Sequence, residues 1–217
     1  GYTVGCNLRC IFCWAHETRD NFEREMDFYS PEEVYGKLMD LIKMNPGMNK
    51  ARISDGEPTL CKDHILELIE LFEKSDAEQF ILETNGILMG NDPEFVKELS
   101  KFKKLYVRVD LKAGTPEAFS KKTGALPEAF DLPFKAVRSL SELGMCFGVA
   151  AMSADPRFMD PLERVSLVLK LGEIAPELVL RLEEEMTILF PTARQRLEAR
   201  GWDLENKKVP ALLRKTL

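Results

Sequence analysis

The sequence predicts an α/β fold of six strand–helix units, arranged as a partial (β/α)6 TIM-like barrel with a parallel sheet inside and helices outside. Two observations carry this prediction. Short aliphatic and β-branched runs alternate along the chain with longer runs whose apolar residues recur at helical spacing. Units of this kind form parallel sheets with right-handed crossovers. Functional groups in such barrels lie at the carboxyl ends of the strands.

Six strand-like runs are expected, and the first leads directly into a cysteine-rich loop. The fourth run has the clearest alternation, since its aliphatic residues are separated by Tyr106, Arg108 and Asp110. The expected strands are Tyr2–Val4, Ala51–Ser54, Phe80–Thr84, Leu105–Leu111, Cys146–Met152 and Leu178–Leu182.

Helical runs fall between and after these strands. The first is expected to begin with Ser30 as N-cap and Pro31 as its first residue. Gly144 and Gly201 are expected to end two of the helices. The expected helical runs are 31–42, 64–74, 92–102, 129–144, 161–173 and 192–201.

Length and composition indicate one core domain over residues 1–200, followed by a C-terminal tail at 201–217. The net charge of −6 disfavours a broad basic face for nucleic acid. No apolar run is long enough to cross a membrane, and no signal peptide is visible. Five cysteines without a paired pattern predict a reducing, cytoplasmic location. Cys146, in an apolar run, is expected in the core.

Three cysteines near the start of the chain have the spacing C-x3-C-x2-C: Cys6, Cys10 and Cys13. Three thiolates so close in sequence can hold one soft metal centre and leave its fourth position open to a small molecule. With His16 the same run also supplies four ligands for a closed structural zinc site, which would make this a zinc-binding protein without enzymatic activity. The strand–helix repeat favours the open site.

Polar residues follow the expected strands where the fold predicts a site. Arg108, Asp110 and Lys112 share the face of the fourth strand that is opposite its aliphatic residues, so they are expected to point into the lumen. Arg181 and Glu183 repeat this arrangement on the sixth strand, either as substrate contacts or as an internal ion pair. The second and third strands end in Ser54, Asp55, Gly56, Glu57 and in Glu83, Thr84, Asn85.

The run GCNLRCIFCW resembles the signature of the radical S-adenosylmethionine (radical SAM) superfamily. The resemblance implies that the three thiolates hold a 4Fe–4S cluster whose open iron binds SAM through its amino and carboxylate groups. It further implies reductive cleavage of SAM to a 5′-deoxyadenosyl radical, which abstracts hydrogen from a substrate. Phe12 matches the aromatic residue that lies near the adenine in this family.

The stretch from Ser54 to Pro58 resembles the GGEP motif of the same family, with Asp55 in place of the usual first glycine. The resemblance implies that the backbone of Ser54–Gly56 and the side chain of Glu57 bind the SAM ammonium. Met152, at the end of the fifth strand, is assigned as a further SAM contact.

Two further stretches, LETNG and VDLKAGTPEAFSKKTG, resemble the glycyl-radical-enzyme activase branch. This finer resemblance places Glu83, Asn85, Asp110 and Lys112 near the methionine and ribose of SAM. It also implies a monovalent cation beside the SAM carboxylate, with Glu83, Thr84 and Asp110 as candidate ligands. Arg108 is the alternative source of positive charge at that position.

The resemblance implies an electron donor such as ferredoxin or flavodoxin. It leaves three substrate classes open: a partner protein, as in the activase branch, a small molecule, and RNA. Trp14 and His16 are similar to the corresponding run of the radical SAM enzyme of wyosine synthesis in tRNA. The basic residues Lys101, Lys103 and Lys104, and a second group at 207–215, are interpreted as solvated surface.

Overall fold

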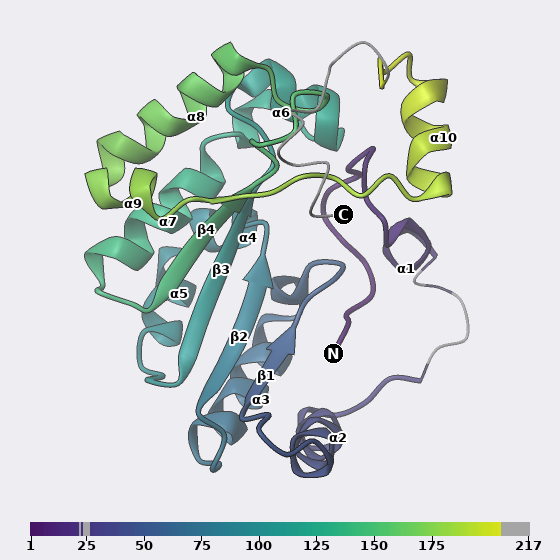
Figure 1. The fold of residues 1–217 in the computed structure, drawn as a ribbon. Coiled ribbons are helices and arrows are strands. Elements are labelled where there is room, and N and C mark those ends of the chain that lie inside the picture. Colours follow the sequence, from purple (N-terminus) through teal and green to yellow (C-terminus); the bar gives the residue numbers. More distant parts are fainter. Residues whose placement is uncertain (22, 24–26, 205–217) are drawn as a thin grey trace. The chain divides into compact units, whose positions relative to one another are not determined.

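The computed structural model describes residues 1–21, 23 and 27–204 (Figure 1). The chain divides into two compact units. Unit 1 contains residues 1–7, 15–110 and 132–148, and unit 2 contains residues 8–14, 111–131 and the chain from Val149 onward. Within the expected tail, residues 205–217 lie outside the described part, as does the second basic group. The division between a core at 1–200 and a tail stays a prediction.

Five strands form one sheet in the order β1-β2-β3-β4-β5. β1 pairs with β2, β2 with β3, and β4 with β5, and each of these pairs is parallel. This arrangement confirms the α/β class with a parallel sheet flanked by helices, which Figure 1 shows for β1 to β3. The strands are β1 (Lys50–Ile53), β2 (Gln79–Thr84), β3 (Leu105–Leu111), β4 (Phe147–Ala151) and β5 (Glu183–Glu184).

The expected first strand, Tyr2–Val4, is reduced to a single parallel bridge between Tyr2 and Ser54. The Thr3 N–H donates to the Ser54 carbonyl at 3.0 Å. The next ladder position is lost because the Gly5 N–H donates to the Thr18 carbonyl instead, which draws the chain toward helix α1 (His16–Asp20). The N-terminal segment is therefore attached to the end of β1 by its backbone without forming a strand.

The expected sixth strand, Leu178–Leu182, is wrong. Residues Pro176–Leu180 form helix α9, and the strand β5 begins only at Glu183. Pro176 at the first helical position and Glu177 in the first turn are helix-start signals that outweigh the aliphatic alternation of a short run. Arg181 follows α9 directly, so the alternation of faces predicted for Arg181 and Glu183 does not hold.

The helices agree with the expected runs over much of the described chain. Ser30 caps α2 with a complete capping box to Glu33, as expected. Helices α4 and α6 were not expected; α6 begins at the N-cap Thr115 and ends at Gly124. The remaining bounds are α2 (Pro31–Met44), η1 (Pro58–Leu60), α3 (Lys62–Glu73), α4 (Ile87–Asn91), α5 (Pro93–Leu99), α6 (Pro116–Thr123), η2 (Pro127–Ala129), α7 (Leu132–Glu142), α8 (Pro161–Ile174) and α10 (Pro191–Ala199).

The core of unit 1 lies between its strands and the helices α3, α4, α5 and α7. Every second residue of β3 is buried, including Leu105, Val107 and Val109. Tyr106 and Arg108 on the opposite face stay half-buried, which confirms the alternation predicted for this strand. Cys146 is exposed, and the expectation that it lies in the core is wrong, because it precedes β4 and joins the sheet only through its carbonyl.

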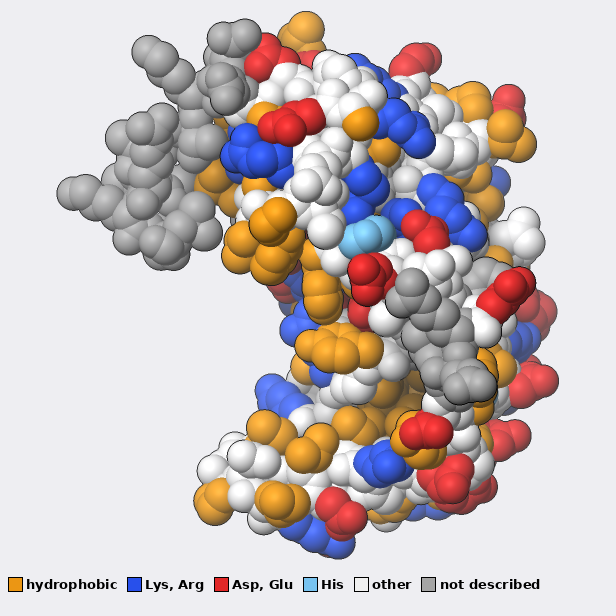
Figure 2. All heavy atoms as spheres, turned by 90° about the vertical axis from the view of Figure 1, so that its right-hand side faces the viewer, with side chains coloured by type: hydrophobic (Ala, Val, Ile, Leu, Met, Phe, Trp, Pro, Cys, Tyr) orange, Lys and Arg blue, Asp and Glu red, His pale blue; other side chains and the backbone are white. Residues whose placement is uncertain are grey.

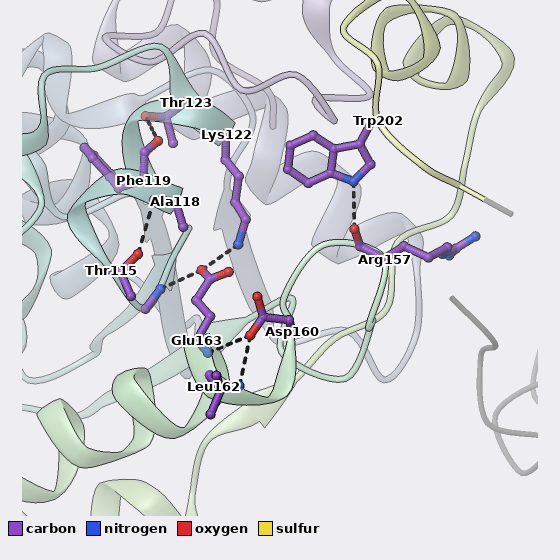
Figure 3. Close-up of polar contacts among 11 residues, drawn as sticks. Thr115, Ala118, Phe119, Lys122, Thr123, Arg157, Asp160, Leu162, Glu163 and Trp202 are labelled. Carbon is purple, nitrogen blue, oxygen red and sulfur yellow. Dashed lines mark hydrogen bonds and ion pairs between the residues drawn. The ribbon is translucent and has the colours of Figure 1, made fainter. Parts of the chain in front are cut away.

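Unit 2 contains a buried ion pair between α6 and α8 (Figure 3). Lys122 Nζ lies 2.6 Å from Glu163 Oε1, and both side chains are less than a tenth exposed. The same oxygen accepts the Gly114 N–H at 2.9 Å. Asp160 caps α8 by accepting the N–H groups of Leu162 and Glu163. The pair therefore fixes the end of α6 to the first turn of α8.

We expect Lys122→Met to lower the free energy of unfolding by about 3–5 kcal/mol, because Glu163 would keep a buried charge without its cation. Lys170→Met is the matched control, since the pair of Lys170 with Asp131 lies at the surface and should contribute about 0–1 kcal/mol. Urea unfolding of both variants measures the difference. Equal losses would show that the buried pair stabilises no more than a surface pair.

Candidate functional site

The cysteine loop begins in unit 1 with Cys6 and continues in unit 2 with Cys10 and Cys13. Cys10 is buried, and Cys6 and Cys13 are partly exposed. A turn follows Cys10, whose carbonyl accepts the Cys13 N–H at 3.2 Å. Each end of the loop has contacts within its own unit.

In unit 1 the carboxylate of Glu57 joins three segments. Glu57 is 2% exposed, and its Oε1 accepts hydrogen bonds from Thr59 Oγ1 at 2.6 Å and Thr84 Oγ1 at 2.7 Å. Its Oε2 accepts the Asn85 N–H at 2.7 Å, while the Glu57 N–H donates to the Gly5 carbonyl at 2.9 Å. This one side chain therefore ties the end of β2 to the turn after β1, and its backbone ties that turn to the start of the cysteine loop.

Burial raises the pKa of the Glu57 carboxyl. The hydrogen bonds from Asn85, Thr59 and Thr84 act in the opposite direction, because they favour the ionised form. The accepting capacity of the two oxygens is largely used by these protein donors.

The turn formed by Asp55 and Gly56 brings its backbone against the N-terminal segment. Asp55 has φ of 63° and is the only non-glycine residue with positive φ among the described residues. Its carboxylate accepts the Gly56 N–H at 2.9 Å and the Thr18 hydroxyl at 3.4 Å. A Cβ on Gly56 would lie 2.4 Å from the Gly5 carbonyl oxygen, so only glycine fits there. Burial raises the pKa of Asp55.

Asn85 links the end of β2 to the first cysteine. Its Nδ2 donates to Asn7 Oδ1 at 2.7 Å and lies 3.9 Å from Cys6 Sγ, within the range of a hydrogen bond to sulfur. Its Oδ1 accepts the Ile87 N–H, which holds the side chain at the start of α4. The predicted residues Glu57, Thr84 and Asn85 are thus in direct contact with one another, and Asn85 also contacts Cys6.

In unit 2 the cysteine loop lies against α6 and α10. The Arg9 N–H donates to the Thr123 carbonyl at 2.8 Å, and the Ile11 N–H donates to the Lys122 carbonyl at 2.9 Å. From the other element, Arg196 Nε donates to the Ile11 carbonyl at 3.3 Å, and Arg196 Nη2 donates to the Cys13 carbonyl. Arg196 could not be selected from sequence, because an arginine on an amphipathic helix has no distinguishing pattern.

Phe12 and Met152, which were predicted to contact SAM, pack against the same apolar cluster in unit 2. The Phe12 ring meets Phe158 edge to face, with centroids 5.6 Å apart, and Phe158 stacks on Trp202 at 5.9 Å. The buried members of the cluster are Ile11, Phe158 and Leu197. An aromatic side chain adjacent to Cys13 is therefore held in a fixed orientation.

A row of charged side chains crosses the polar face of unit 1. Glu83 on β2 lies opposite Arg108 on β3, and Arg108 Nη1 is 2.8 Å from Glu83 Oε1. Arg52 from β1 binds the same oxygen of Glu83. Glu83 and Arg108 are largely buried, whereas Arg52 is half exposed. The predicted polar face therefore carries charged side chains. Glu83, a candidate ligand of the cation, is already paired with the guanidinium groups of Arg52 and Arg108.

The other predicted residues are distributed between the units. Ser54 and Asp110 are half-buried in unit 1, and Lys112 is half-buried in unit 2. Arg181 and Glu183 are exposed in unit 2, and the strand expected to orient them does not form. Their roles as substrate contacts or as an ion pair stay predictions.

The residues of the loop fit an iron–sulfur cluster by donor chemistry, since soft thiolates are the ligands such clusters take. In the described part of the chain, no three His, Cys, Asp or Glu side chains converge on a single metal ion. His16, the fourth ligand of the zinc alternative, is the first residue of α1 in unit 1. Its Nδ1 is buried, and no hydrogen-bond partner is found for it among the described residues.

The profile of the Radical SAM superfamily matches residues 2–152, and the chain belongs to this superfamily. A probable GTP 3′,8-cyclase of Methanocaldococcus jannaschii is 31% identical over 80% of this chain and 57% of its own length. An Fe-coproporphyrin III synthase of Methanosarcina barkeri is 31% identical over 68% of this chain and 34% of its own length. The chain thus spans about half or less of these relatives, which are named as enzymes.

The crystal structure of Streptococcus suis SuiB bound to S-adenosylmethionine has the same fold, with a TM-score of 0.62 over 79% of this chain and 36% of that one, at 20% identity. Radical SAM enzymes use a 4Fe–4S cluster and SAM, so the expected cofactors are confirmed for the family. The finer resemblance to the activase branch stays a prediction. No helix in the described ranges has the length and apolarity of a membrane span.

The raised pKa of Glu57 predicts a pH-dependent stability. A carboxyl whose pKa is higher in the folded than in the unfolded protein holds its proton more tightly when folded. Its contribution to stability is therefore complete below the unfolded value of 4.5 and is lost as pH rises through the folded pKa. We expect the unfolding free energy of the wild type, relative to that of Glu57→Gln, to decrease as pH rises above about 4.5.

Urea unfolding of both proteins at closely spaced pH values measures this difference. The comparison removes the contributions of all other carboxyl groups, because they are the same in both proteins. A difference that grows with pH would contradict this prediction. It would mean that the hydrogen bonds from Thr59, Thr84 and Asn85 outweigh burial and lower the pKa of Glu57.

Proposed function

We propose that this protein cleaves SAM reductively at a 4Fe–4S cluster held by Cys6, Cys10 and Cys13. The bound cluster and SAM would supply a 5′-deoxyadenosyl radical that abstracts hydrogen from a substrate. The observation that carries the proposal is the cysteine loop itself, whose backbone is fixed at both ends within a chain of the radical SAM superfamily. Ferredoxin or flavodoxin is the proposed electron donor.

For SAM binding, the proposal divides the roles of the two carboxylates after β1. Glu57 accepts four hydrogen bonds from the protein, so its part is to hold the turn and the end of β2 in place. Asp55 is half-buried and accepts a hydroxyl only at 3.4 Å, which leaves it able to accept from the SAM ammonium. The backbone of Ser54–Gly56 completes that site.

We assign the remaining SAM contacts to four of the predicted residues. Phe12, oriented by Phe158, would face the adenine, and Met152 lies against the same cluster. Asp110 and Lys112 would bind the ribose and methionine parts. Arg108 and Arg52, which already hold Glu83, supply positive charge where the activase branch has a monovalent cation.

We favour a small molecule over a partner protein or RNA as the substrate. The two curated relatives named above are named for reactions of small molecules, and each is 31% identical to this chain. SuiB, which has been crystallised with its precursor peptide, shares only 20% identity and shares only the fold. Against RNA, Lys and Arg side chains are interspersed with Asp and Glu on the face in Figure 2.

The cluster can be tested by anaerobic reconstitution. We expect about four irons per chain in the wild type, the content of one cubane cluster. Cys10→Ala should lose the cluster and SAM cleavage, because two thiolates cannot hold it. Cys61→Ala is the matched control, since Cys61 is an exposed cysteine outside the loop, and it should retain both. Tight zinc binding without iron in the wild type would favour the structural zinc site instead.

The role of Arg108 can be tested through cation dependence. If the arginines replace the cation, potassium should have little effect on the affinity of the reconstituted wild type for SAM. Arg108→Ala should then acquire a potassium dependence, because Glu83 loses a cationic partner. Sodium at equal ionic strength is the control, and calorimetric titration measures affinity. A strong potassium dependence in the wild type would mean that the cation site is kept and that Arg108 serves another group.

A further inference from the structure

Arg196 is a charged residue with two contacts to the backbone of the cysteine loop, and the proposed function does not use it. Its Nε donates to the Ile11 carbonyl at 3.3 Å, and its Nη2 donates to the Cys13 carbonyl. Ile11 directly follows Cys10, and Cys13 is the last cysteine of the C-x3-C-x2-C run. The contacts lie within unit 2 and span more than 180 residues of sequence.

We infer that Arg196 is a positioning residue for the cluster ligands Cys10 and Cys13, and that its positive charge raises the reduction potential of the cluster. The inference rests on the proposed function, since it concerns a cluster held by these cysteines. It assigns a role to α10, which lies beyond the residues matched by the superfamily profile.

The geometry supports a clamp because the loop is bound from two elements. From α6, the Thr123 carbonyl accepts the Arg9 N–H, and the Lys122 carbonyl accepts the Ile11 N–H. Arg196 binds the carbonyls of the loop from α10. The N–H and the C=O of Ile11 are thereby both bound, directly after Cys10. Arg196 reaches the two carbonyls with two different nitrogens of its planar fork, whereas lysine would have to serve both from a single nitrogen.

The helix that carries Arg196 is itself fixed against the loop. Leu197, the next residue, is fully buried in the cluster with Ile11 and Phe158. The Trp202 N–H donates to the Leu197 carbonyl at 2.9 Å, and the Trp202 indole donates to the Arg157 carbonyl at 2.7 Å (Figure 3). The burial of Leu197 and the hydrogen bonds of Trp202 therefore hold the end of this helix beside the apolar cluster.

The electrostatic part of the inference follows from the permanence of the charge. A guanidinium stays protonated in proteins, so Arg196 places a fixed positive charge beside the cluster ligands. Net charge and hydrogen bonding around a cluster set its reduction potential. A nearby cation stabilises the state that has gained an electron, and the potential should fall when that cation is removed.

The experiment compares Arg196→Gln and Arg196→Lys with the matched control Arg194→Gln in the reconstituted full-length protein. Arg194 lies on the same helix, is half exposed and pairs only at 3.4 Å with Glu198 among the contacts found for it. Three quantities are measured: iron content, the midpoint potential with the EPR spectrum of the reduced cluster, and amide hydrogen exchange at Ile11 in the metal-free protein.

We expect Arg196→Gln to bind iron but to have a more negative midpoint potential and an altered EPR spectrum. Its Ile11 amide should exchange roughly tenfold faster, since a charge-assisted contact to the loop is lost. Arg196→Lys should restore the potential but not the slow exchange, because it keeps the charge and loses the fork. Arg194→Gln should match the wild type in all three measurements.

Wild-type potential and exchange in Arg196→Gln would overturn the inference while the proposed function stands. If Arg196→Gln does not fold, Arg196→Lys decides: wild-type exchange in that variant would exclude the clamp. A wild-type protein that takes up no iron would overturn the proposed function and the effect of Arg196 on the potential. The clamp is judged separately, because Ile11 exchange is measured in the metal-free protein.

Discussion

The arrangement of unit 1 depends on the buried carboxylate of Glu57. Its oxygens bind Thr59, Thr84 and the Asn85 amide, and its backbone N–H binds the Gly5 carbonyl. Each hydrogen bond to a charged group contributes about 1.5–3 kcal/mol, and removal of the carboxylate would leave several buried donors unsatisfied. A charge can be buried at this position because nearly all of its accepting capacity is used. These hydrogen bonds make Glu57 a structural anchor for the turn after β1 and the end of β2.

The second constraint concerns the eight-residue loop from Cys6 to Cys13, which must hold three thiols in place although its backbone is irregular. A loop without secondary structure has backbone groups that need partners elsewhere. In unit 1 Asn85 binds the side chains of Asn7 and Cys6. In unit 2 the last carbonyls of α6 and the guanidinium of Arg196 bind the backbone of the loop. Rigid surrounding elements therefore fix the loop, which is what a preorganised ligand set requires.

Asp55 shows how a departure from a family motif is accommodated locally. Its left-handed backbone suits glycine, but aspartate tolerates that conformation better than other residues, since its side chain can bind the adjacent backbone. The Asp55 carboxylate does so by accepting the Gly56 N–H. The strict requirement for glycine falls instead on Gly56, where the Gly5 carbonyl leaves no room for a Cβ. Asp55 thus adds a half-buried carboxylate to the turn.

The parts of the fold that were predictable from sequence are those specified by local pattern. The alternation in β3, the cap at Ser30 and the cysteine spacing each belong to a few consecutive residues. The error at 178–182 arose because a five-residue run with four aliphatic residues fits a strand or a helix equally well, and Pro176 outside the run decided between them. Glu57 could be selected from its motif, but the four hydrogen bonds that its carboxylate accepts follow only from the tertiary fold. Arg196 had no signal at all, since its partners are backbone carbonyls more than 180 residues away, and any residue type supplies a carbonyl.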